Sequence, residues 1–173
     1  PVLNAPALKV GGLSRFSATD WPGKLAAVVF VQGCPWACSY CHNPHLQPRA
    51  SDATLQWADV ERWLQGRVGL LDGVVFSGGE PTLDPALPQA MLAVRDLGFQ
   101  VGLHTAGIYP DRLQTVLPLV DWVGLDIKTG FADYERVTAV PRSGGPVQTC
   151  LALLRDAVRT SGLSLEGRTT RHP

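Results

Sequence analysis

The chain has 173 residues, and its 45% hydrophobic and 17% charged content is typical of a globular domain, not of a disordered segment or a coiled coil. Fifteen basic and fifteen acidic residues cancel, so the charge predicts no nucleic-acid partner and no membrane surface. The longest apolar stretch, at 25–31, is too short to span a bilayer and lacks the layout of a secretory signal. We therefore expect a cytoplasmic protein, in which clustered cysteines favour metal or redox chemistry over disulfides.

The first part of the chain, residues 1–24, contains the turn sequence DWPGK and is expected to form an irregular cover or an extra edge strand. After it come short apolar runs that are bounded by turn residues and show little alternation. Buried strands of a parallel sheet have this pattern. The predicted strands are 25–32, 73–77, 99–103, 122–127 and 163–170.

Helical patterns lie between these strands, at 54–64, 84–98, 110–117 and 146–158. In the second of them, Asp84 is expected to cap the helix, with Pro85 in the first turn. The β/α alternation predicts an α/β fold with right-handed crossovers. A full eight-unit barrel needs about 250 residues, so residues 25–173 predict a partial, open TIM-like barrel. The last strand runs straight into RTTRHP with no helix after it, and we expect the chain to be truncated at its C-terminal end.

Each predicted strand is followed by polar or glycine-rich residues. These are the run GCPWACSYCHN at 33–43, SGGEP at 77–81, HTAG at 104–107, DIK at 126–128, and Arg168 within the last strand. Functional groups of α/β folds gather at the carboxyl ends of the strands. The sequence therefore predicts a functional rim at this end of the barrel.

Three of the four cysteines, Cys34, Cys38 and Cys41, fall within eight positions. Thiolates at short spacing on one loop commonly hold iron–sulfur clusters. A three-cysteine loop would leave one iron of a four-iron cluster open for chemistry. A zinc site completed by His42 or His45 is the alternative, and it would make the chain a non-catalytic metal-binding module. Cys150 lies in a helical pattern and is expected to be a small buried hydrophobe.

The C-x3-C-x2-C motif at the end of the first predicted parallel strand, followed by GGEP after the second, resembles the radical S-adenosylmethionine (SAM) superfamily. The fuller strings DWPGKLAAVVFVQGCPWACSYCHNP, GVVFSGGEPTL and WVGLDIK resemble the enzymes that activate glycyl-radical enzymes. That branch includes activators of anaerobic ribonucleotide reductase and of pyruvate formate-lyase. The resemblance covers nearly the whole chain from about residue 10.

The resemblance implies one [4Fe–4S] cluster and SAM as cofactors. It further implies reductive cleavage of SAM to a 5′-deoxyadenosyl radical, which abstracts hydrogen from a glycine of a partner glycyl-radical enzyme, with anaerobic ribonucleotide reductase as the expected partner. A flavodoxin or ferredoxin would donate the electron. The alternative within the superfamily is an enzyme that acts on a small molecule, of the deazapurine-forming type.

The resemblance also implies roles for single residues. Cys34, Cys38 and Cys41 would each bind one iron, and the amino and carboxylate groups of SAM would chelate the fourth. Tyr40 would lie against the adenine, although it could be a packing aromatic. Residues 78–80 (Gly78, Gly79 and Glu80) would hold the methionine amino group, because glycines permit close backbone approach. An ordinary turn is the alternative for Glu80.

Three further residues would contact the cofactor. Asp126 would meet a ribose or a cation, Lys128 the methionine carboxylate, and Arg168 would be a second carboxylate clamp. A solvated ion pair and an exposed arginine are the structural alternatives. Related activators have Asp-Thr-Asn-Gly where this chain has His104-Thr105-Ala106-Gly107. The imidazole and the methyl group are poor ligands for a hard cation, which weakens the expectation of a monovalent-cation site and favours a pocket hydrogen bond for His104.

Overall fold

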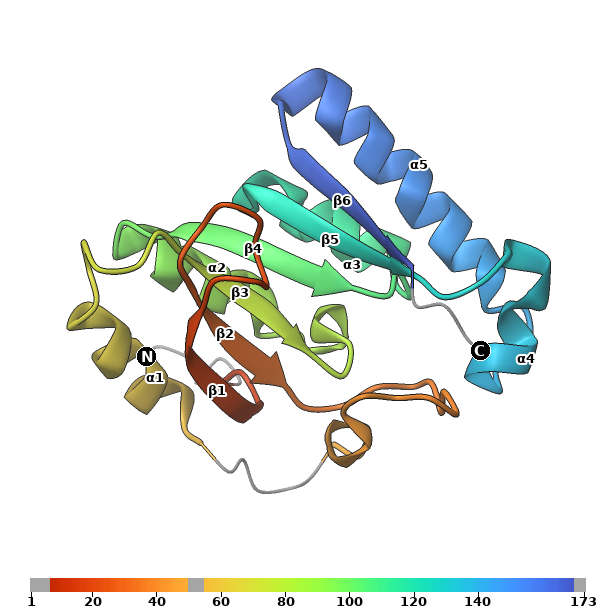
Figure 1. Ribbon diagram of the computed structural model, residues 1–173, viewed down its shortest axis with the longest axis horizontal. Helices are drawn as coiled ribbons and strands as arrows, with labels where there is room; N and C mark the ends of the chain where they lie inside the picture. Colours follow the sequence, from red (N-terminus) through yellow and green to blue (C-terminus); the bar gives the residue numbers. More distant parts are fainter. Residues whose placement is uncertain (1–6, 50–54, 170–173) are drawn as a thin grey trace, which may run out of the picture.

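The computed structural model describes residues 7–49 and 55–169 of the chain (Figure 1). Predictions that fall on residues 1–6, on Thr54 and on Thr170 lie outside the described residues. Six strands form one sheet in the order β1-β2-β3-β4-β5-β6. The strands are β1 (Val10–Ser17), β2 (Ala26–Val31), β3 (Gly73–Gly78), β4 (Gln100–Thr105), β5 (Trp122–Ile127) and β6 (Ser164–Thr169).

Strands β2 to β6 are parallel, and β1 pairs with β2 in the antiparallel direction. The open sheet, with its five parallel strands, confirms the partial-barrel prediction. Strand β1 lies at one edge of the sheet, within the part of the chain for which an irregular cover or an edge strand was expected. Figure 1 shows the succession from β1, in red, to β6, in blue. All five parallel strands therefore present their carboxyl ends at the same rim.

The main helices are α1 (Trp57–Gln65), α2 (Leu87–Asp96), α3 (Pro110–Val116) and α5 (Gly144–Ser161). Short elements are α4 (Tyr134–Thr138), η1 (Pro44–Leu46), η2 (Pro81–Leu83), η3 (Leu117–Leu119) and η4 (Phe131–Asp133). The capping prediction for α2 was wrong, because η2 precedes the helix and Ala86 is its N-cap. Asp84 instead accepts hydrogen bonds from the amide of Ala86 at 2.9 Å and from Arg49 at 3.0 Å.

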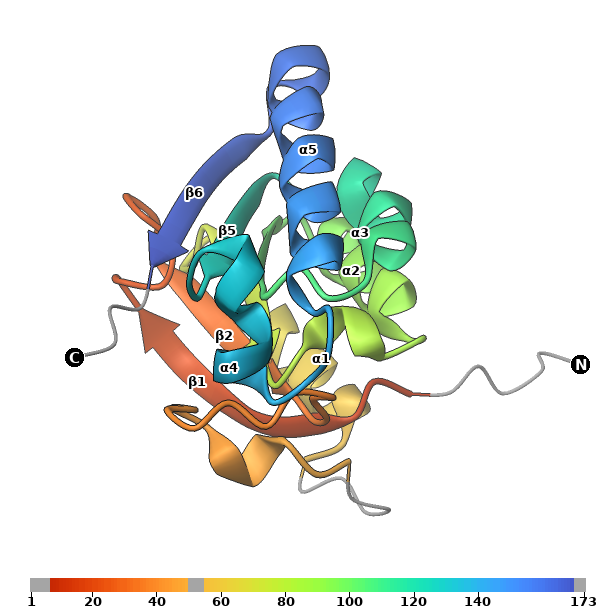
Figure 2. The same ribbon diagram turned by 90° about the vertical axis from the view of Figure 1, so that its right-hand side faces the viewer.

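Figure 2 shows α1, α2, α3 and α5 on the outer side of the curved sheet. Alternate strand residues point outward, so Val74 and Phe76 join the main hydrophobic core with Met91 of α2 and Leu154 of α5. Burial of each such side chain contributes about 1.5–3 kcal/mol. No helix within the described residues is long and apolar enough to cross a membrane.

The inner side of the sheet carries a second, smaller cluster, in which Trp21 and Trp122 stack with ring centroids 5.6 Å apart. Glycines on three neighbouring strands make room for these rings. A Cβ at Gly73 or Gly102 would lie 2.8 Å or 3.0 Å from the Trp21 ring, and one at Gly124 would lie 2.9 Å from Trp122. Two indoles therefore pack closely against the inner side of the sheet.

Candidate active site

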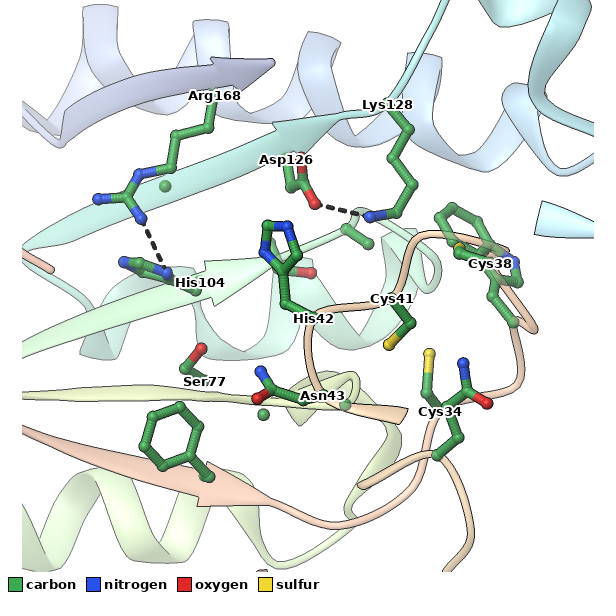
Figure 3. Close-up of a pocket in the computed structure, with 18 of the residues that line it drawn as sticks. Cys34, Cys38, Cys41, His42, Asn43, Ser77, His104, Asp126, Lys128 and Arg168 are labelled. Carbon is green, nitrogen blue, oxygen red and sulfur yellow. Dashed lines mark hydrogen bonds and ion pairs between the residues drawn. The ribbon is translucent and has the colours of Figure 1, made fainter. Parts of the chain in front are cut away.

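A pocket of about 390 Å³ opens at the carboxyl ends of the parallel strands (Figure 3). Its volume is near the lower end of the range for small-molecule sites. The pocket collects nearly all the residues predicted to act: its lining includes Cys34, Cys38, Tyr40, Cys41, Gly78, Gly79, Asp126, Lys128 and Arg168. The expected functional rim is therefore a single concave site.

The cysteine loop leaves β2 through Gly33, which has a φ of +102°. Backbone hydrogen bonds then fix the loop, from Gly33 N to Leu46 O at 2.8 Å and from Cys34 N to Gln47 O at 3.0 Å. Leu46 is buried beneath it. These anchors hold the loop against the end of the sheet, with its three half-buried thiols on one side of the pocket.

Helix α4, which the sequence did not reveal, supports the other side of this loop. The amide of Ala37 donates to Thr138 O at 3.1 Å, and the ring of Trp36 lies edge-on to that of Tyr134 at 5.8 Å. The Tyr134 hydroxyl accepts from the amide of Lys128 at 3.0 Å. Tyr134 therefore ties the cysteine loop to the end of β5.

The pKa of the Cys34 thiol is raised to about 11, mainly by burial; a backbone hydrogen bond from Trp36 opposes the rise, and the nearby charge of Glu80 adds to it. Burial also raises the pKa of Cys38, which Lys128 partly offsets. Metal binding requires thiolates, so loading this site releases protons. Lys128 is the cation that favours the thiolate form of Cys38.

Gly78 and Gly79 bring the cysteine loop and the end of β3 into close contact. Gly78 has a φ of +127°, and a Cβ there would collide with the backbone of Val31. A Cβ at Gly79 would collide with Gly33 O. Both glycines line the pocket, so the backbone of this tightly packed turn forms part of the pocket wall.

Glu80 departs from the expected direct contact with the cofactor, because it is fully buried and does not line the pocket. Its Oε1 accepts hydrogen bonds from Thr82 N at 3.1 Å, Thr82 Oγ1 at 2.5 Å and Thr105 Oγ1 at 2.8 Å, and its Oε2 accepts from Ala106 N at 2.9 Å. Burial raises the pKa of this carboxyl, and the four hydrogen bonds oppose that rise. In this geometry Glu80 joins the turns that follow β3 and β4.

Asp126 and Lys128 form an ion pair inside the pocket, with 2.6 Å between Oδ2 and Nζ (Figure 3). The Lys128 ammonium also lies 5.7 Å from the centre of the Tyr40 ring. Burial lowers the pKa of Lys128, but Asp126 outweighs burial and the net shift is upward. The lysine thus remains charged beside the cysteines, and its side chain is only 13% exposed, unlike that of a solvated surface pair.

Arg168 lines the pocket, but its guanidinium already contacts the chain. Nη1 lies 3.3 Å from His104 Nδ1, and Nη2 lies 3.3 Å from Asp20 O. His104 thus makes the pocket hydrogen bond expected of it. Burial lowers the pKa of its imidazole, and the charge of Arg168 acts in the same direction.

Several lining residues were not assigned to the cofactor from the sequence. They are His42, Asn43, Ser77, Thr105 and Thr169. His42, Ser77 and Thr169 each stand next to an assigned residue, Asn43 lies two positions after Cys41, and Thr105 follows His104. Figure 3 shows His42 between the cysteines and Asp126. The only sequence signal for these lining residues was their position close to a predicted motif at the end of a strand. The prediction for Cys150 is confirmed, because it is buried in the main core.

The donor set fits an iron–sulfur cluster better than a single zinc ion. Within residues 7–49 and 55–169, no three His, Cys, Asp or Glu side chains converge to hold one metal ion. Of the two histidines considered as zinc ligands, His42 lines the pocket and His45 does not. In a cluster each thiolate binds a different iron, and three thiols spread along one wall meet that requirement. The side-chain-free turn at 78–79 and the Asp126–Lys128 pair complete a polar cradle beside them.

Two relatives are named as activating enzymes. A protein from Methanocaldococcus jannaschii, named as a glycyl-radical enzyme activating enzyme, is 28% identical over 95% of this chain and 68% of its own length. The pyruvate formate-lyase-activating enzyme of Clostridium pasteurianum is 33% identical over 79% of this chain and 59% of its own length. The chain therefore spans about 60–70% of these relatives.

The fold and the family agree with the geometry. QueE from Escherichia coli superposes with a TM-score of 0.53 at 15% identity, covering 95% of each chain, which shows a shared fold. The family model of the radical SAM superfamily matches residues 28–165. A [4Fe–4S] cluster and SAM are the cofactors of that superfamily. The chain belongs to the radical SAM superfamily.

Proposed function

We propose that this protein is an activating enzyme that uses SAM to generate a radical on a glycine of a partner glycyl-radical enzyme. The observation that carries the proposal is the single pocket in which three loop thiols face the bare turn at 78–79 and the Asp126–Lys128 pair. The names of the archaeal and clostridial relatives support the choice of this branch of the superfamily.

In this proposal Cys34, Cys38 and Cys41 hold the [4Fe–4S] cluster. When bound and reduced, the cluster supplies the electron that splits SAM into methionine and the 5′-deoxyadenosyl radical that abstracts hydrogen. The chain's own residues bind, orient and protect the cofactor. Half-burial of the loop thiols and the apolar packing around Trp36 keep water from the cluster side of the pocket.

The remaining lining residues receive roles from their chemistry. The backbone at Gly78 and Gly79, which lines the pocket and packs tightly against Val31 and Gly33, receives the methionine amino group. Lys128 faces the methionine carboxylate, and Tyr40, held near Lys128, offers its ring to the adenine. Asp126 keeps Lys128 charged and in place, and its second oxygen faces the ribose or a cation.

Glu80 acts from behind this wall rather than on the cofactor itself. Its four hydrogen bonds fix Thr105 and Ala106, which line the pocket, against the β3 turn. The expected partner is anaerobic ribonucleotide reductase, the electron donor a flavodoxin or ferredoxin, and the location the cytoplasm.

The test uses the full-length protein, loaded with its cluster and reduced with dithionite in the absence of oxygen. We expect 5′-deoxyadenosine to form from SAM, and a carbon-centred radical signal to appear on a glycyl-radical protein from the same organism. Cleavage of SAM with turnover of a purine-like small molecule and no radical transfer would favour the small-molecule alternative. No cleavage by cluster-loaded protein would refute the enzymatic proposal.

A further inference from the structure

Arg168 and His104 lie across the pocket from the cysteines, on the inner side of β6 and β4 (Figure 3). The sequence suggested that Arg168 reaches out to a carboxylate of the cofactor. The contacts of its guanidinium point instead toward the chain. They involve the loop before β2 and the histidine near the end of β4, both distant from Arg168 in sequence, and Glu166 on its own strand.

The hydrogen bonds of His104 define its protonation. Nε2 lies 2.8 Å from the carbonyl oxygen of Asp20, which can only accept, so Nε2 carries the proton. Nδ1 of the neutral ring is then an acceptor, and it faces Nη1 of Arg168 at 3.3 Å. The two contacts are mutually consistent only for the neutral ring with its proton on Nε2.

Arg168 extends the same connection. Nη2 lies 3.3 Å from Asp20 O and 3.5 Å from Thr19 O, and Nε lies 3.4 Å from Glu166 on its own strand. The guanidinium carbon is 5.7 Å from the centre of the Trp122 ring. These contacts occupy the guanidinium on several sides and join β6 to residues nearly 150 positions earlier.

The loop held in this way carries Trp21. The backbone of Asp20 is fixed by both His104 and Arg168, and the next residue places its indole in the barrel interior against Trp122. The indoles pack so closely on the three glycines opposite them that a Cβ at any of these positions would come within 3.0 Å of a ring. The pocket is lined by Asp20, His104, Gly124 and Arg168, and the indoles lie beneath this floor.

We propose that Arg168 and His104 are positioning residues that clasp the loop carrying Trp21 and so fix the floor of the cofactor pocket. The proposal rests on the proposed function only for the identity of the ligand above that floor. It assigns Arg168 an indirect role in place of the carboxylate contact suggested by the sequence. A fixed floor limits the depth of the pocket and keeps water out of the barrel interior.

The test is a double-mutant cycle with Arg168→Gln and His104→Phe, and with Arg155→Gln on the exposed face of α5 as control. In cluster-free protein we expect each single variant to lower the melting temperature by about 3–6 °C, as for loss of one or two hydrogen bonds to a charged group. We expect the double variant to be no worse than the poorer single variant, because both remove one connected unit. Near-UV circular dichroism should lose the same part of the indole signal in all three, while Arg155→Gln leaves it unchanged.

The second arm measures SAM binding to cluster-loaded protein by equilibrium titration. The clasp predicts that both single variants raise the dissociation constant by a similar factor, about three- to tenfold. His104→Gln, which keeps one donor and one acceptor, should recover part of the indole signal. An unchanged indole spectrum and unchanged SAM affinity in His104→Phe, with weak binding in Arg168→Gln alone, would overturn the proposal and make Arg168 a direct clamp. The cluster-free arm does not depend on whether the protein activates a partner.

Discussion

Replacement of Glu80 separates direct cofactor contact from support of the pocket wall. The side chain is fully buried and accepts four hydrogen bonds, from Thr82, Thr105 and Ala106. Glu80→Ala removes every one of these acceptors and leaves a cavity beneath the turn. Glu80→Gln keeps the shape but turns an amide group toward one or more of the donors.

The expected loss of stability follows from these contacts. A buried donor left without a partner costs about 1–3 kcal/mol, and the two threonine hydroxyls can rotate toward other acceptors. We therefore expect Glu80→Ala to cost about 2–5 kcal/mol, a large part of the 5–15 kcal/mol typical of a domain. For a chain of this size that corresponds to a fall in melting temperature of roughly 5–15 °C. Glu80→Gln should fall between Glu80→Ala and the wild type.

Thermal unfolding of the cluster-free protein, followed by far-UV circular dichroism, measures this loss without any cofactor. Glu135→Ala, at an exposed position on α4, is the matched acidic control and should change stability by no more than about 0.5 kcal/mol. The reasoning would be refuted if both Glu80 variants melted like the wild type and yet bound SAM poorly after cluster loading. That result would place the carboxylate on the cofactor.

Three further predictions concern the pocket. Alanine at any one of the three loop cysteines should abolish the iron–sulfur absorbance of reconstituted protein, whereas Cys150→Ala should keep it; equal loss in Cys150→Ala would contradict the ligand assignment. The pKa of His104 is lower in the folded protein than in the unfolded chain, so as the pH falls the unfolded chain takes up the proton first. The contribution of His104 to the free energy of unfolding is therefore complete above about pH 6.5 and decreases as the pH drops toward the folded-state pKa. Denaturant unfolding at several pH values should show this decrease, and His104→Phe should make it smaller. Lys128→Ala should keep the cluster but weaken SAM binding about tenfold or more, because it removes a charged contact. It should also raise the pKa of the Cys38 thiol, which can be measured from the pH dependence of its alkylation rate in cluster-free protein. Unchanged SAM binding and unchanged alkylation would mean that Lys128 has only a structural role.

The strands and the cysteine loop could be predicted because their signals are local. Buried parallel strands are continuous apolar runs, and β5 (Trp122–Ile127) was predicted with the bounds that the structure has. The motif spacing placed the thiols on a single strand-end loop, and the pocket confirms that they lie together with the turn at 78–79. Helix α4 escaped prediction because its five residues are too few to show a helical period.

The roles of Glu80, Arg168 and Trp21 could not be predicted, because their partners are distant in sequence. Glu80 is satisfied partly by the next strand, and Arg168 by a loop at the other end of the chain. The space for Trp21 is made by glycines on β3 and β4, each of which is an ordinary strand glycine until the strands pair. For such residues the sequence indicates the chemical group, but only the folded structure shows which groups it contacts.

The most direct test of the cofactor pocket is electron paramagnetic resonance of the anaerobically reduced, cluster-loaded protein with and without SAM. Three cysteine ligands leave one iron open, so SAM should bind it and change the signal of the reduced [4Fe–4S] cluster. Metal analysis of the same sample should give about four irons per chain, as expected for one such cluster. A signal that SAM leaves unchanged, or a protein that holds one zinc ion and no iron after reconstitution, would contradict the assignment of the pocket.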